Sequence, residues 1–114
     1  MITRGHLRTL ALSLPEVVEL DHHGMDSYRI RGRIFATVPD DHHVRVMVDE
    51  TEIRAAVTED PSTFEAVTWG GRLGCVAVDL RTVSSEHLHQ LLTEAWLRKA
   101  PVRLARSFGE RSAG

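Results

Sequence analysis

Apolar and polar residues alternate most clearly between residues 22 and 48, and this period of two predicts β-strands. We expect three strands here, over residues 26–30, 33–38 and 43–48. Turn-forming residues separate them, with Arg31-Gly32 after the first strand and Pro39-Asp40-Asp41-His42 after the second. The pattern therefore predicts an antiparallel ribbon around which the rest of the chain packs.

The length of the first turn decides which side chains share a face of this ribbon. A three-residue turn, Ile30-Arg31-Gly32, pairs Arg29 with Arg33 and puts Gly32 in a left-handed conformation that suits glycine. A two-residue turn pairs Ile30 with Arg33 and mixes polarity on both faces. We expect the three-residue turn because it separates apolar from polar side chains. One face then holds Tyr28, Ile34, Ala36 and Val38, and the other holds Ser27, Arg29, Arg33, Phe35 and Thr37.

Helical periodicity occurs on both sides of the ribbon. Apolar residues at a 3.6-residue period predict a helix over residues 3–14, with Thr3 as its N-cap and Pro15 at its end. A short helix is expected to begin at Asp49. The strongest helical stripe of the chain is Leu88–Trp96. The remaining strands are expected at residues 16–20, 64–68 and 74–80.

This order of elements is typical of an α+β domain. We expect a single compact domain with an antiparallel sheet and with the N-terminal and C-terminal helices packed on it. The length of 114 residues suits one such domain over residues 1–108, followed by a disordered tail at residues 109–114.

Composition narrows the function classes. A net charge of -2 differs from the strongly basic balance of most nucleic-acid-binding domains, so any such binding needs a local patch. Cys75 is the one cysteine, which excludes an intrachain disulfide, and its apolar neighbours favour a buried thiol over a nucleophile. The chain shows no secretion-signal pattern and no apolar run of membrane length, so we expect a cytoplasmic protein without membrane contact.

Arginines on the ribbon are the main candidates for a binding surface. In the expected register Arg29, Arg33 and Arg45 line one sheet face, where guanidinium groups can contact phosphates. The candidate nucleic-acid-binding residues are Arg29, Arg31, Arg33, Arg45, Trp69 and Arg72. The alternative is a solvated face whose arginine stems cover apolar atoms, with Trp69 as a hydrophobic plug under the Gly70-Gly71 turn.

The sequence contains no catalytic signature, so we expect neither an enzyme nor a cofactor. A metal site is an alternative that requires one histidine from His22-His23 and one from His42-His43, because adjacent residues on an extended chain point in opposite directions. A further alternative is a module that binds a protein partner or forms a homodimer, with Phe35 and Met47 exposed between the arginines.

Several short segments, taken in order and spacing, resemble the MmcQ/YjbR family of small bacterial proteins over about residues 5–106. They are Leu14-Pro15-Glu16, Ser27–Ala36, Asp60-Pro61, Trp69-Gly70-Gly71, Ala95-Trp96 and Ala100-Pro101. The resemblance implies a double-wing or CyaY-like α+β fold and possible DNA binding, with no enzymatic activity and no cofactor. The chain departs from the family pattern at Asp26, where proline is common, and at Tyr28, where phenylalanine is common.

Overall fold

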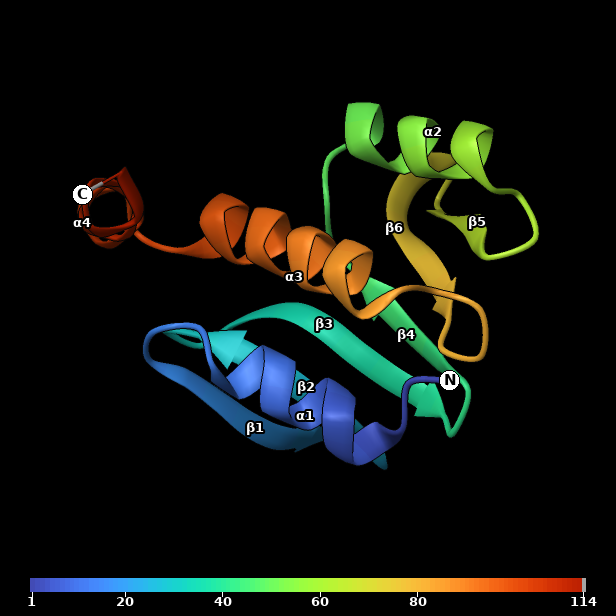
Figure 1. The fold of residues 1–114 in the computed structure, drawn as a ribbon, viewed down its shortest axis with the longest axis horizontal. Helices are drawn as coiled ribbons and strands as arrows, with labels where there is room; N and C mark the ends of the chain where they lie inside the picture. Colours follow the sequence, from blue (N-terminus) through green and yellow to red (C-terminus); the bar gives the residue numbers. More distant parts are fainter. Residues whose placement is uncertain (114) are drawn as a thin grey trace.

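Six β-strands form one antiparallel sheet in the order β1-β2-β3-β4-β6-β5 (Figure 1). The structure is a computed structural model that describes residues 1–113, with the side chains of residues 1–109. The strands are β1 (Val17–His22), β2 (Met25–Ile30), β3 (Arg33–Asp40), β4 (His43–Val46), β5 (Phe64–Trp69) and β6 (Arg72–Asp79). The helices are α1 (Arg4–Leu12), α2 (Glu50–Glu59), α3 (Ser85–Lys99) and α4 (Val102–Ala113). This architecture confirms the predicted α+β class.

Three helices cover one face of the sheet. Leu7 of α1, Ile53 of α2 and Leu92 of α3 join a single hydrophobic cluster with the strand residues Tyr28 and Val78. Figure 1 shows α1 lying over β1 and β2, with α3 running alongside β3. Within the described chain no helix lies on the opposite face, which we call the helix-free face.

The N-terminal helix begins directly after Thr3, as predicted, and ends at Leu12, two residues before the predicted end. The Thr3 hydroxyl accepts a hydrogen bond from the His6 amide at 3.0 Å, which satisfies one of the free N–H groups of the first turn. At the other end, the fully buried Trp96 of α3 donates its indole N–H to the Pro15 carbonyl at 3.0 Å. This bond ties α3 to the segment that follows α1.

The first hairpin corrects the predicted register. Its turn has two residues, Arg31 at φ 51° and Gly32 at φ 80°, so Ile30 pairs with Arg33. A two-residue turn with regular pairing would mix polar and apolar residues on both faces. A β-bulge removes this conflict, because Phe35 is an extra residue between Ile34, which pairs with Arg29, and Ala36, which pairs with Tyr28. Phe35 therefore faces the core and is fully buried, and the prediction that it shares the polar face is wrong.

The second hairpin repeats the same construction. Gly70 at φ 58° and Gly71 at φ 81° form a two-residue turn, and Trp69 pairs with Arg72. A register shift follows, which leaves Gly74 as the extra residue on β6. Two-residue turns with positive φ at both positions match the twist of the flanking strands. In each hairpin, two residue pairs follow the turn before the bulge changes which residues of the second strand face the core.

The C-terminal segment forms a helix that extends into the predicted tail. Residues 109–113, which belong to the predicted tail, continue α4, and Gly114 lies outside the described residues. The side chain of Phe108 contacts the Trp96 ring edge-on, with the two ring centres 5.1 Å apart. Among the described residues, no helix is both long and apolar enough to cross a membrane.

Candidate nucleic-acid interface

The helix-free face carries a continuous row of side chains across all six strands. Strand register places these residues next to one another in the order Leu20, Ser27, Thr37, Arg45, Ala77 and Glu65. Short side chains occupy much of the middle of the row. Ser27 and Thr37 are nonetheless buried. Arginine side chains lie beside these small residues on the helix-free face.

Arg29 and Arg45 lie beside the buried residues Ser27 and Thr37 on this face. The Arg29 Nε donates to the Ser27 Oγ at 3.1 Å, and that hydroxyl donates in turn to the Leu20 carbonyl at 2.7 Å. Ser27 and Arg45 are two strands apart, a spacing of about 10 Å. Among the described residues, no carboxylate forms an ion pair with either arginine. Both guanidinium groups are thus available to an external anion.

Trp69 and Arg72 extend the same face at the end of the second hairpin. Half of the Trp69 side chain is exposed, so it is not the buried plug considered as an alternative. Its ring lies directly on Gly74, because a Cβ at that position would be 2.0 Å from the ring atom Cε3. Arg72 pairs with Trp69 across the hairpin and is exposed. Residues that pair directly share a sheet face, so a flat aromatic surface lies beside a free guanidinium group.

Cys75 of β6 is on the helix-free face. It is two residues before Ala77, the partner of Arg45, and it pairs with Val67, two residues before Trp69. Burial raises the pKa of its thiol to about 11, and the charge of Arg45 only partly opposes this rise. A thiol in this state is protonated near neutral pH and is a poor nucleophile. The prediction of a buried cysteine is confirmed.

The two arginines at the tip of the first hairpin, Arg31 and Arg33, contact other groups of the protein. Arg31 forms an ion pair with Glu16, with Nε to Oε1 at 2.7 Å. Arg33 pairs with the core residue Ile30 and donates to the Lys99 carbonyl at 3.4 Å, on the helix-covered side. The prediction that Arg33 shares a face with Arg29 and Arg45 is therefore wrong. Its cause is the two-residue turn, which shifts Arg33 to the opposite face.

Each histidine pair makes contacts with residues close to it in the sequence. His22 and His23 contact each other, with ring centres 4.5 Å apart. His43 Nδ1 lies 2.9 Å from Asp40 Oδ1. Across the described residues, no group of three histidine, cysteine, aspartate or glutamate side chains is arranged to hold a metal ion. The metal alternative therefore gains no support from the geometry.

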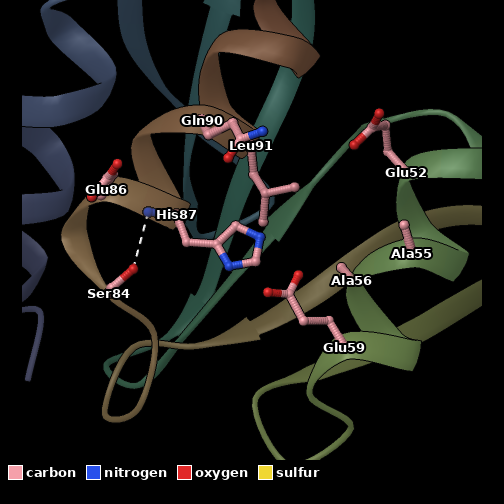
Figure 2. Close-up of a pocket in the computed structure, with 9 residues that line it drawn as sticks. All are labelled: Glu52, Ala55, Ala56, Glu59, Ser84, Glu86, His87, Gln90 and Leu91. Atoms are coloured by element: carbon pink, nitrogen blue, oxygen red, sulfur yellow. Dashed lines mark hydrogen bonds between the residues drawn. The ribbon is translucent and has the colours of Figure 1, made fainter.

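A groove between α2 and α3 has the opposite electrostatic character. It encloses about 380 Å³ and is lined by Glu52, Glu59 and Glu86 together with His87. Figure 2 shows the His87 imidazole pointing from α3 towards α2, where Glu59 lies, while Glu86 points away from it. The imidazole also packs on Phe64, with ring centres 4.7 Å apart. Three carboxylates repel phosphates, so this groove is not a nucleic-acid surface.

Comparison with known proteins agrees with the fold. The family model described as YjbR matches residues 12–98. A crystal structure of the Deinococcus radiodurans protein DR2400, with the family-model domain DUF419, superposes with a TM-score of 0.74 at 21% sequence identity. The superposition covers 86% of this chain and 78% of that one. No curated protein gives a significant match.

Proposed function

The chain belongs to the YjbR family, and from that premise we propose that it is a non-enzymatic module that binds DNA through its helix-free face. The proposed interface is the helix-free face of the sheet and does not include the tip of the first hairpin. Its contact residues are Arg29, Arg45 and Arg72 for phosphates and Trp69 for a base. Arg31 and Arg33 have no direct part in it, because Glu16 and Lys99 already engage them.

One observation carries this proposal. Arg29, Arg45 and Arg72 share a sheet face with a half-exposed tryptophan, although the chain as a whole has a net charge of -2. Five other arginines form ion pairs with carboxylates, whereas these three form none among the described residues. Three of the seven arginines without an ion pair among the described side chains thus lie on the one face without helices, which also carries Glu65. Free guanidinium groups suit phosphate oxygens, which they can contact with two parallel hydrogen bonds.

Single-stranded DNA fits this face better than a duplex. Stacking on Trp69 requires an unpaired base, and a stacked base contributes about 1–3 kcal/mol to binding. An open sheet with aromatic and basic side chains is also the kind of surface on which single strands are bound elsewhere. Three phosphate contacts predict that log K falls with log salt at a slope of about -2, at roughly 0.7 per contact.

A protein partner is a second candidate for the same face. Val18 and Leu20 of the edge strand β1 are 48% and 50% exposed, and strand register places both on the helix-free face. Apolar residues beside arginines are typical of protein interfaces. Binding to such a partner, or to a second copy of the chain, would depend only weakly on salt.

Fluorescence anisotropy with a labelled mixed-sequence single strand, and with its duplex, tests the proposal at low salt. We expect the single strand to bind more tightly than the duplex. The Arg29→Gln/Arg45→Gln variant should bind weakly and with a flatter salt dependence, since each lost phosphate contact removes about one unit of slope at most. Arg31→Gln is the charge control, matched to the single variants Arg29→Gln and Arg45→Gln, because it removes one positive charge from a group already paired with Glu16.

The proposal fails if Arg31→Gln weakens binding as much as the sheet-face variant does, since the interface would then be the hairpin tip. It also fails if the parent binds neither form of DNA at low salt. In that case sedimentation equilibrium, with Leu20→Glu beside the parent, tests the apolar half of the face for self-association.

A further inference from the structure

A second cluster of arginines surrounds a hollow on the other side of the second hairpin. The hollow encloses about 550 Å³ where α2 begins, α3 ends and β5 turns into β6. Arg54, Arg72 and Arg98 line it from three different elements, and Glu50 is the one carboxylate residue among the described lining residues. Taken together, these side chains give the hollow an excess of positive charge.

Two of the guanidinium groups are held in place by the protein. Arg98 donates from Nη1 to the Met47 and Val48 carbonyls at 3.1 and 3.2 Å, so its Nε and Nη2 are left for another acceptor. Arg54 donates from Nε and Nη2 to one oxygen of Glu50, at 3.0 and 2.7 Å, which leaves its Nη1. Binding an anion here costs less side-chain entropy than binding at two unrestrained arginines.

The surroundings of α3's last turn add to the positive potential. The pKa of Lys99 is lowered, first by burial and then by the charges of Arg98 and Arg33. A carbonyl contact explains the position of Arg98, and a helical ion pair explains that of Arg54. Neither contact explains why arginines from α2 and α3 line the same hollow.

We propose that this hollow binds a small phosphate monoester. Guanidinium forks match the oxygens of a phosphate group. Arg54 and Arg98 outnumber the one glutamate of the hollow even without Arg72, whose side chain shares the helix-free face with Trp69. Thr68 and Leu73 line the same hollow and offer a hydroxyl group and an apolar surface to the organic part of the ligand. The volume lies within the range of about 300–1,000 Å³ that is usual for small-molecule sites. The guanidinium groups of Arg54 and Arg98 are not part of the proposed DNA interface, so the two sites can be tested separately.

Amide NMR titration with adenosine 5′-monophosphate tests this site, with adenosine and inorganic phosphate as separate arms at constant ionic strength. The monophosphate should shift the amides of Thr68, Gly71 and Leu73, and adenosine should not. Arg54→Gln should weaken binding at least fivefold. Glu50→Gln should strengthen it at least twofold, because the variant removes a repulsive carboxylate and frees Arg54. A purely structural role for this ion pair would not produce that gain.

Several outcomes overturn the assignment. One is shifts of equal size with adenosine, and another is inorganic phosphate binding as tightly as the monophosphate. A third is equal weakening by Arg81→Gln, an exposed arginine paired with Asp79, since binding would then follow overall charge. Arg45→Gln separates the two proposals, because it should weaken single-stranded DNA and leave the monophosphate unaffected. Arg54→Gln should do the reverse.

Discussion

Replacing Gly74 with alanine tests whether β6 holds the Trp69 ring on the helix-free face. An alanine Cβ would lie 2.0, 2.5 and 2.8 Å from the Cε3, Cζ3 and Cδ2 atoms of Trp69. Ordinary carbon contacts begin near 3.5 Å, so the ring must move by more than one ångström. Gly74 has no positive φ, so the backbone itself accepts alanine and the clash with the ring is the main cost in the folded state.

Two terms set the expected size of the effect. Overpacking costs about 1–3 kcal/mol, and the lower half of that range applies because Trp69 is half-exposed and can swing away. Alanine also restricts the unfolded chain, which stabilises the protein by about 0.4–1 kcal/mol. We therefore expect Gly74→Ala to destabilise the parent protein by no more than about 1.6 kcal/mol. In a Trp69→Ala background the same substitution should be neutral or stabilising.

Urea unfolding of the parent, both single variants and the double variant measures this coupling directly. The account predicts a coupling free energy of about 1–2 kcal/mol between the two positions. Gly74→Ala should also weaken single-stranded DNA binding, because the displaced ring no longer presents a fixed stacking surface. If Gly74→Ala changes the free energy of unfolding equally in the parent and in the Trp69→Ala background, the ring does not lie on Gly74.

Three further predictions concern the core and its titrating groups. Phe35→Ala should lower the unfolding free energy by about 3–5 kcal/mol in urea melts, because the bulge buries this ring; a cost near zero would restore the exposed-face register. Hydrogen bonding to Arg81 lowers the pKa of Asp79 to about 2, so the stability it contributes is complete above pH 4 and is lost as the pH falls towards 2. Asp79→Asn should therefore flatten the pH dependence of unfolding in that range, and an unchanged curve contradicts the pairing. Cys75 should resist a thiol reagent at pH 8 until the protein unfolds, because burial raises its pKa to about 11; rapid native-state labelling contradicts this burial.

The fold was largely predictable because it follows from local signals. Thr3, Pro15 and the Leu88–Trp96 stripe mark helix boundaries and faces through short-range rules that hold in any context. The register of the first hairpin was not predictable in this way. An arginine at φ 51° is an uncommon choice for a two-residue turn, and strict alternation cannot reveal a bulge at Phe35.

The candidate site was predicted in part. Arg29, Arg45, Trp69 and Arg72 were recognisable as arginines and an aromatic residue on expected strands. Arg33 was misplaced because a one-residue change in register moves a side chain to the other face. The arginine hollow had no sequence signal, since Arg54 and Arg98 come from separate helices that only the folded chain brings together.

Side-chain NMR of the arginine Nε–H and tryptophan indole N–H groups during titration with single-stranded DNA shows which side chains contact the strand. The account predicts large shifts for Arg29, Arg45 and Trp69, and small shifts for Arg31 and for the buried Trp96. Shifts concentrated on Arg31 and Arg33, or spread evenly over all arginines, would contradict a binding surface on the helix-free face.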